Sequence, residues 1–221
     1  MRHVQETRGR YELRLPCLSH LTCFIGSYNK VFALKFDNGV EAIARIPTAL
    51  AGAPFFATAS EVATLEFARE VLGIPAPRVF AWSADSTAKN PVGTEYIIME
   101  KISGVEFHHR WTHIAKGPEV FPLLNGVFDI ERSFEGAPFS QIGSLYFKDD
   151  VRADLRDRPL FRPGSLPECD TELHRRLDAA KDKYRVGPIA DRQWWRPGRS
   201  QVTLDHGPCG FPLYAVDIEI T

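Results

Sequence analysis

Two oppositely charged residues could form a phosphate-binding pair. Arg45 lies in the apolar run 40–46, two residues after Ile43 and therefore on the same face of an extended strand. A guanidinium there can hold phosphate oxygens in a bidentate manner. Glu61 falls on one helical stripe with Leu65 and Leu72, so it is expected to face the strands rather than solvent. The sequence thus predicts that Glu61 pairs with Arg45 and orients it.

Each of these residues also has a simpler interpretation. An arginine on a strand is commonly an ordinary surface residue. The segment Thr58-Ala59-Ser60-Glu61 matches a capping box, in which Glu61 would only satisfy a backbone N–H group of the first helical turn. Glu66 and Glu70 lie on other faces of the predicted helix and are expected to be solvated. The sequence leaves both interpretations of Arg45 and Glu61 open.

Two further segments could contact a nucleotide. Gly26 stands between the first two predicted strands, where a missing side chain lets the backbone approach phosphate, and Ser27 and Asn29 add polar side chains. Extended backbone at Glu100 to Ile102 could pair with the edge of an adenine base. The alternatives are an ordinary turn at Gly26 and a core strand that ends in a turn.

The elements that would position these residues follow from the periodicity of the chain. A helix is predicted from 58 to 72, because Gly73 and the prolines after it stop the pattern. An Asn-Gly pair between apolar runs is a strong hairpin signal. Strands are therefore predicted within 20–46, with a hairpin turn at Asp37-Asn38-Gly39, and at 78–82 and 94–101. The predicted order is three strands, one helix and two strands.

The second half of the chain has a different pattern. Residues 105–135 are predicted to be mainly helical, and a short helix is predicted near 170–184 between loops. The candidate core positions of the first helical segment are Trp111, Ile114, Phe121, Leu124 and Phe128.

Composition excludes several classes of function. The 221 residues are 44% hydrophobic and 25% charged with a net charge of −1, which is typical of a globular protein without a general attraction to nucleic acid. No apolar run approaches the ~20 residues that span a membrane. The four cysteines lack C-x-x-C spacing and His109 and His113 have no third ligand, so neither a disulfide framework nor a metal site is predicted. Trp194-Trp195 is interpreted as packing, because no basic patch accompanies it.

Several segments resemble the fungal branch of the aminoglycoside phosphotransferase-like (choline kinase-like) family. They are collinear from about residue 22 to 214 and read GSYNKVFAL (26–34), DNGVEAIARIP (37–47), TASEVATLEFAREVLGIPAPRVFAWSA (58–84), NPVGTEYIIMEKISGVEF (90–107), FSQIGSLYFKDD (139–150), RVGPIADRQWWRPGR (185–199) and LDHGPCGFPLY (204–214). The resemblance implies an α+β, protein kinase-like fold with a complete N-lobe, made of a five-stranded antiparallel sheet plus one helix, and an incomplete, mainly helical C-lobe. The implied domains are a lead-in at 1–21, the N-lobe at 22–104 and a partial C-lobe at 105–221.

The same resemblance implies phosphoryl transfer from Mg-ATP to a small-molecule hydroxyl. On matching positions, Gly26 to Asn29 correspond to the phosphate loop, Arg45 to the phosphate-binding cation, Glu61 to its partner, and Glu100 to Ile102 to the adenine hinge. The resemblance also implies a mitochondrial location, with the cytoplasm as the alternative. It does not specify the acceptor substrate.

The chain lacks two motifs of that family. A catalytic loop of the form H-x-D-L-H-x-x-N and a metal-binding I-D-W segment are absent from the 221 residues, and Leu204-Asp205-His206-Gly207 is predicted to be an ordinary loop. Such motifs supply the base and the Mg²⁺ ligands. No catalytic or metal-ligating residue is therefore predicted, and the chain is expected to bind ATP weakly without transferring phosphate. The alternatives are a non-catalytic interaction protein that binds a protein partner through exposed C-lobe surface, and a fragment from an incomplete gene model whose full-length product is an ATP-dependent small-molecule phosphotransferase.

Overall fold

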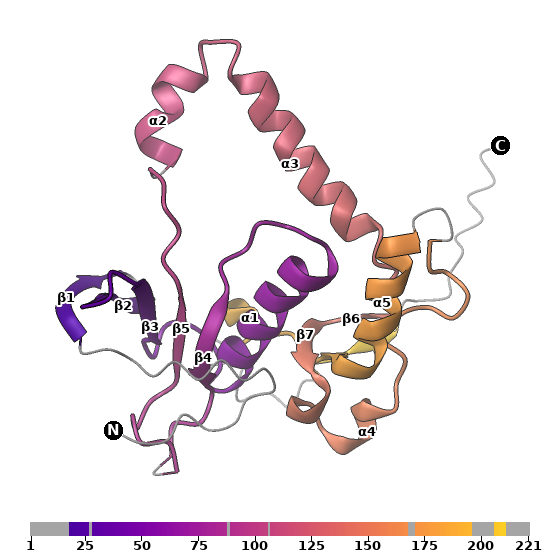
Figure 1. Ribbon diagram of the computed structural model, residues 1–221. Coiled ribbons are helices and arrows are strands. Elements are labelled where there is room, and N and C mark those ends of the chain that lie inside the picture. The colour runs from indigo at the N-terminus through magenta and orange to yellow at the C-terminus, as the bar shows by residue number, and fades with distance from the viewer. Residues whose placement is uncertain are drawn as a thin grey trace.

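A five-stranded antiparallel sheet forms one side of the molecule (Figure 1). The computed structural model describes residues 18–26, 28–87, 89–105, 107–167, 171–195 and 206–210, so most of the predicted lead-in lies outside the described residues. The sheet has the order β1-β2-β3-β5-β4, with β1 (Leu18–Ile25), β2 (Asn29–Phe36), β3 (Glu41–Pro47), β4 (Val79–Ser83) and β5 (Tyr96–Glu100). All four pairings are antiparallel. The predicted α+β class and the five antiparallel strands are confirmed.

The β2–β3 hairpin turns at the predicted Asn-Gly pair. Gly39 adopts a φ of 82°, and its N–H donates to the carbonyl of Phe36 at 3.0 Å. The N–H of Val40 donates to the side-chain oxygen of Asn38 at 3.0 Å. Positive φ costs glycine little, so the turn chemistry fixes the register of β3 and thereby places Arg45.

The predicted helix follows β3 and packs on one face of the sheet (Figure 1). It consists of α1 (Phe56–Glu66) and a π-helical turn, η1 (Phe67–Val71), and Gly73 follows with a φ of 72°. The helix begins two residues before the predicted start at residue 58. Its N-terminus is held by Glu95, a buried residue whose carboxylate accepts the N–H of Phe55 at 2.8 Å.

The second half of the chain contains two exposed helices and a compact unit of short elements. The helices are α2 (Phe107–Ile114) and α3 (Val120–Glu135), and the further elements are β6 (Gln141–Ile142), β7 (Ser144–Phe147), η2 (Lys148–Asp150), α4 (Ala153–Arg156), α5 (Thr171–Lys183), β8 (Tyr184–Gly187), η3 (Arg192–Trp195) and β9 (Cys209–Gly210). β7 pairs with β8, and β6 with β9. The predicted helix near 170–184 is α5, whereas β7 and β8 form where loops were predicted.

The prediction that α2 and α3 contribute core residues is wrong in its main part. Four of the five candidates, Trp111, Phe121, Leu124 and Phe128, are between 45% and 68% exposed, and only Ile114 is half-buried. Neither helix has a buried residue. Figure 1 shows the reason, since the α2–α3 arm (residues 107–135) extends away from the rest of the molecule. Within the described part of the chain, no other element therefore packs over the apolar side of the α2–α3 arm.

The largest hydrophobic core joins the two halves of the chain. Phe67 of η1 is at its centre, with ring centroids 5.5 Å from Phe139, 5.4 Å from Tyr184 and 6.5 Å from Phe161. The cluster also contains Leu177 of α5. The helix that covers the sheet thus packs on its other side against α5 and β8, and the core crosses the predicted boundary between residues 104 and 105.

The prediction that Glu66 is solvated is wrong, whereas Glu70 is exposed as expected. The carboxylate of Glu66 accepts a hydrogen bond from the hydroxyl of Tyr184 at 3.2 Å and pairs with Lys183. Burial and the nearby charge of Glu66 raise the pKa of Tyr184. Glu66 therefore connects α1 to the α5–β8 junction, a long-range contact that helical periodicity alone does not predict.

No helix in the described ranges has the length and apolar character needed to cross a membrane.

Candidate functional site

Arg45 and Glu61 meet between the sheet and α1, as predicted. A guanidinium nitrogen of Arg45 donates to a carboxylate oxygen of Glu61, and the two side chains are 26% and 33% exposed. Since α1 begins at Phe56, Glu61 lies beyond its first turn, and Thr58 is buried within the helix. The capping-box interpretation is therefore wrong, and so is the interpretation of Arg45 as an ordinary surface residue.

The pairing keeps a half-buried cation available for an anion. Partial burial lowers the pKa of the Arg45 guanidinium below its ordinary value. Glu61 balances this desolvation cost by placing an opposite charge in direct contact. A guanidinium carries five N–H donors, and one carboxylate oxygen occupies only part of them. The arrangement can therefore orient Arg45 and still leave N–H groups for phosphate oxygens.

The predicted phosphate loop lies at the same end of the hairpin as Arg45. The N–H of Gly26 donates to the carbonyl of Asn29 at 2.9 Å, which closes the β1–β2 turn. Asn29 pairs with Pro47 in the β2–β3 ladder, two positions beyond Arg45 and about 7 Å along the strand. Ser27 lies outside the described residues. The structure thus brings Gly26 and Asn29 close to the end of β3 that carries Arg45.

The other predicted contact residues have different surroundings. Ile43 pairs with Met99 on the face that carries Arg45, and it packs against the cluster formed with Val62 of α1. The N–H of Glu100 donates to the carbonyl of Arg78 at 2.8 Å, so this amide belongs to the sheet. Ile102 follows β5 and is exposed. Ile43 therefore provides apolar side-chain surface beside Arg45. In the predicted hinge, only the residues after Glu100 lie outside the sheet.

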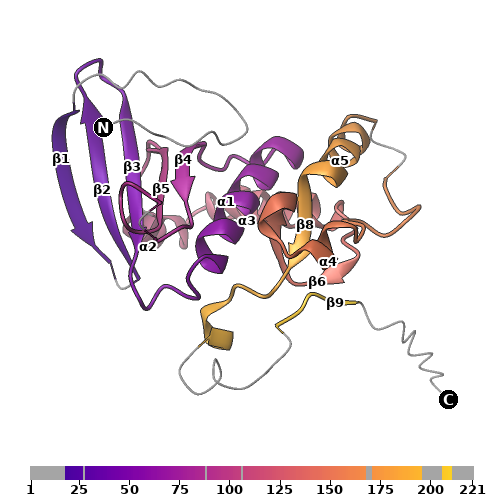
Figure 2. The same ribbon diagram turned by 90° about the horizontal axis from the view of Figure 1, so that it is seen from below.

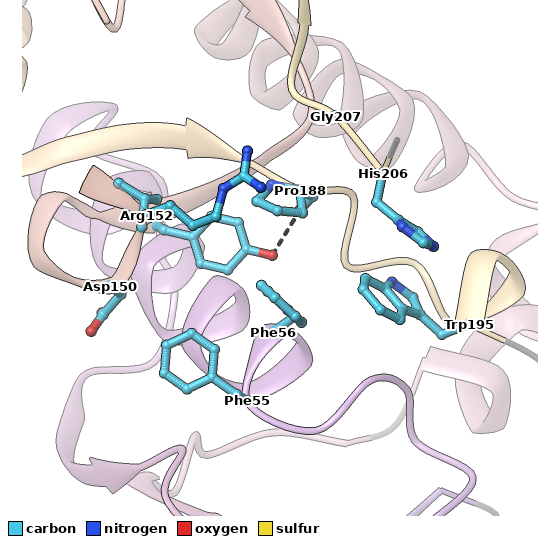
Figure 3. A pocket seen from close by; sticks show the side chains of 10 residues that line it. Phe55, Phe56, Asp150, Arg152, Pro188, Trp195, His206 and Gly207 are labelled. Atoms are coloured by element: carbon cyan, nitrogen blue, oxygen red, sulfur yellow. Dashed lines mark hydrogen bonds between the residues drawn. The ribbon is translucent and has the colours of Figure 1, made fainter. Parts of the chain in front are cut away.

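A separate cavity of about 560 Å³ contains none of the predicted site residues. It is lined by Phe55, Phe56, Tyr146, Asp150, Val151, Arg152, Pro188, Trp195, His206 and Gly207 (Figure 3). The hydroxyl of Tyr146 donates to the carbonyl of Pro188 at 2.8 Å, the dashed line in the figure. The walls are mainly aromatic, and Asp150 supplies a carboxyl group whose pKa is raised to about 6, first by burial and then by the neighbouring charge of Asp149.

The aromatic wall is held together by stacking. Trp195 lies between Phe56 and His206, with ring centroids 5.1 Å and 4.1 Å away. Its indole N–H donates to the carbonyl of Ile189 at 2.8 Å. The predicted packing role is confirmed for Trp195, whereas Trp194 is 40% exposed. The predicted loop at 204–207 is described only at His206 and Gly207, and residues 204 and 205 lie outside the described residues.

Comparisons with known proteins give relatives that are much longer than this chain. It is 38% identical over 184 residues to a subtelomeric hrmA-associated cluster protein of Aspergillus fumigatus, an alignment that covers 83% of this chain and 31% of that protein. It is 31% identical over 193 residues to altered inheritance of mitochondria protein 9, mitochondrial, of Komagataella phaffii, covering 83% of this chain and 29% of that protein. The corresponding protein of Yarrowia lipolytica is 28% identical over 191 residues. The chain spans about a third of the length of these curated relatives.

No family model matches the chain, and no solved structure matches it. The relatives confirm the similarity to altered inheritance of mitochondria protein 9, and their names assign no kinase activity.

Sequence reasoning did not single out two aromatic residues, Tyr28 within the predicted phosphate loop and Phe56 in the wall of the cavity. Tyr28 occupies the β1–β2 turn, and its carbonyl accepts the N–H of Thr48 at 2.8 Å and the Thr48 hydroxyl at 3.0 Å. Phe56 lies at the start of α1 and links the helix to Trp195. Both partners are distant in sequence, so no local motif signals these contacts.

Proposed function

We propose that this chain is the nucleotide-binding part of a kinase-like phosphotransferase of the aminoglycoside phosphotransferase-like family, and that it binds ATP beside Arg45. The observation that carries the proposal is the ion pair between Arg45 on β3 and Glu61 on α1. A cation on the third strand, paired with a carboxylate on the following helix, is the device by which kinases hold the nucleotide phosphates. The collinear motifs and the five-stranded sheet support the same assignment.

Each neighbouring residue has a role in this proposal. Arg45 binds phosphate oxygens through the N–H groups that Glu61 leaves available. Ile43, on the same strand face, offers apolar surface to the base. The β1–β2 turn from Gly26 to Asn29 covers the phosphates from the end of the hairpin. Glu61 acts as a positioning residue, because it touches Arg45 and not the nucleotide.

We propose further that the polypeptide of these 221 residues binds nucleotide without transferring phosphate. The catalytic-loop and metal-binding motifs of the family are absent from this sequence. The described residues include no group of three His, Cys, Asp or Glu side chains placed to hold a metal ion. Phosphoryl transfer depends on metal ions and on a group that positions the nucleophile. The mitochondrial location in the names of the yeast relatives supports the same location for this protein.

Replacing Arg45 by alanine is expected to weaken ATP binding at least tenfold, because a bidentate guanidinium contact to phosphate is lost. Arg45→Lys should give an intermediate loss, since lysine keeps the charge without the fork geometry. Isothermal titration calorimetry with ATP measures both. Arg175→Ala is the matched control, because it removes an arginine paired with Glu172 on the surface of α5.

ATP binding that is absent in the unaltered protein, or equal in Arg45→Ala, would overturn the proposal. A turnover assay with Mg-ATP tests the second part. Turnover that disappears in Arg45→Ala would show that the 221-residue polypeptide is itself a catalyst.

The α2–α3 arm favours a second function, self-association. We propose that two copies of the chain pack their arms together through the stripe that contains Phe121, Leu124 and Phe128, all exposed in the single chain. Exposed apolar patches of this kind commonly mark interaction surfaces. The stripe lies on a 16-residue helix, so two copies can pair helix to helix.

Light scattering after size-exclusion chromatography should show a dimer or larger assembly. Phe121→Asp combined with Phe128→Asp should yield a monomer, because a charge on each side chain prevents burial of the stripe. Asp129→Lys, which changes a charge on the same helix and removes no apolar group, should leave the assembly intact. A monomeric unaltered protein that binds no hydrophobic dye would contradict self-association.

A further inference from the structure

A second arginine reaches the predicted phosphate loop from the other half of the chain. The guanidinium carbon of Arg192, the first residue of η3, lies 4.1 Å from the ring centroid of Tyr28. Tyr28 stands between Gly26 and Asn29 in the β1–β2 turn. In Figure 2 the gold turn of η3 lies beyond the end of the hairpin, near the chain that runs from β3 to α1. The contact therefore joins segments more than 160 residues apart at the site of the proposed function.

Arg192 is placed by a well-anchored segment. The N–H of Ala190 donates to the hydroxyl oxygen of Ser144 at 2.9 Å, and the carboxylate of Asp191 accepts the N–H of Gln193 at 2.8 Å. Trp195, at the other end of η3, is held by the stacking described above. The position of Arg192 is thus set by β7, by its own turn and by α1.

The chain between β3 and α1 lies against the segment that carries Arg192. Gly52 has a φ of 151°, and a Cβ atom there would lie 3.1 Å from the Cβ of Ala57 and 3.8 Å from the Cβ of Arg192. A Cβ atom at this position would be tight against α1 and in ordinary van der Waals contact with Arg192, so the connection lies directly against the segment that carries the guanidinium. The carbonyl of Tyr28 is fixed by Thr48 on the same connection, so this loop anchors the backbone that carries the aromatic ring.

The contact with the ring does not itself occupy the N–H groups of the guanidinium. Stacking on an aromatic ring uses the planar face of arginine, whereas its five N–H donors lie in the plane. In the described part of the chain, no carboxylate forms an ion pair with Arg192. The attraction between the cation and the ring holds the side chain in place without neutralising its charge.

We infer that Arg192 is a second phosphate-binding guanidinium, which contacts the terminal phosphates of the nucleotide while Arg45 holds the phosphates nearer the base. The inference rests on the proposed function and names a further residue of the same site. Asn29, next to Tyr28, pairs with Pro47, two positions beyond Arg45, and the inference places the phosphate chain between the two arginines. Tyr28 serves as the platform that orients Arg192.

Titration with ATP, ADP and AMP tests this assignment, because only the longer phosphate chains extend past Arg45. Arg192→Ala should weaken ATP binding about five- to tenfold and change AMP binding less than twofold. Arg192→Lys should recover part of the ATP affinity, since the charge is retained. Tyr28→Ala should reduce ATP affinity in the same selective way. Arg175→Ala should change none of the three affinities.

The outcomes separate this inference from the proposed function. If the unaltered protein binds ATP and Arg45→Ala weakens it, but Arg192→Ala binds ATP normally, the inference is wrong and the proposed function stands. An equal loss of ATP and AMP affinity in Arg192→Ala would also overturn it, because that result indicates a structural role. If the unaltered protein binds no ATP, the proposed function fails and the inference fails with it. Should Arg192→Ala not fold, Arg192→Gln keeps the side-chain carbons up to Cδ and a polar end without the charge, and the ratio of its ATP affinity to its AMP affinity decides.

Discussion

Replacing Phe67 by alanine should lower the free energy of unfolding by about 3–5 kcal/mol. The side chain is 1% exposed and contacts the rings of Phe139, Phe161 and Tyr184. The variant loses the burial of the aromatic ring and leaves a cavity in the core. The surrounding side chains belong to separate segments of the chain, so they cannot easily move to fill that cavity. Urea denaturation followed by circular dichroism measures the change.

Two variants serve as controls for Phe67→Ala. Phe121→Ala removes an equally large ring that is 68% exposed on α3, so it should change the free energy of unfolding by no more than about 0.5 kcal/mol. Phe67→Leu nearly keeps the volume and should cost less than alanine. Because the core joins both halves of the chain, a single transition is expected. A loss below 1 kcal/mol, or two separate transitions, would contradict a shared core.

The sheet and its helix were predictable because their signals are local. Asn38-Gly39 specifies a hairpin through two residues that tolerate positive φ. The stripe that contains Glu61 and Leu65 specifies one face of a helix. Together these signals placed Arg45 opposite Glu61, and that contact is present in the structure.

The start of α1 was not predictable from the same signals. Thr58 and Glu61 have the spacing of a capping box, yet Thr58 is buried inside the helix. The helix instead begins after Phe55, whose N–H is bound by the carboxylate of Glu95, 40 residues later. A long-range carboxylate performs the function that the local motif assigns to Glu61, and no sequence window around residue 58 contains it.

The contacts of the second half depend on pairs that are far apart in sequence. β7 and β8 pair Ser144 with Gly187, and more than 35 residues separate the two strands, so no short hairpin turn predicts their pairing. The apolar spacing of α3 was recognised, but periodicity identifies an apolar stripe without showing what covers it. For that reason Phe121 and Phe128 were assigned to a core although the structure exposes them.

The candidate site likewise contains one contact that local sequence signals predict and one that they do not. Arg45 belongs to a motif with a fixed place on a strand, and its partner lies on the next element. Arg192 reaches Tyr28 only because η3 is anchored against Ser144 and Phe56. Arg45 and Glu61 lie on consecutive elements, so the sequence predicts their contact. Arg192 and Tyr28 meet only through the tertiary structure, so the sequence does not predict theirs.

Asp150 is a carboxyl group whose ionisation opposes folding. It lines the aromatic cavity beside Phe55 and Val151. Burial is the main cause that raises its pKa from 3.8 to about 6, Asp149 adds to the rise, and Arg156 opposes it. Between these two values the folded protein holds a proton that the unfolded chain releases, so the contribution of Asp150 to stability falls as the pH rises from about 4 to about 6. Above pH 6 the full cost of burying the charge is present.

Asp150→Asn should therefore stabilise the protein at pH 7 by about 2 kcal/mol. The full shift corresponds to about 3 kcal/mol, and partial exposure of the side chain reduces it. At pH 4, where the native carboxyl group is already protonated, the variant and the unaltered protein should have nearly equal free energies of unfolding. Urea titrations at the two pH values measure the difference, and Asp129→Asn on the exposed face of α3 should show no comparable gain. A variant that is less stable than the unaltered protein at pH 7 would mean that the ionised carboxylate has a favourable partner, and that the cavity around it is more polar than its aromatic lining indicates.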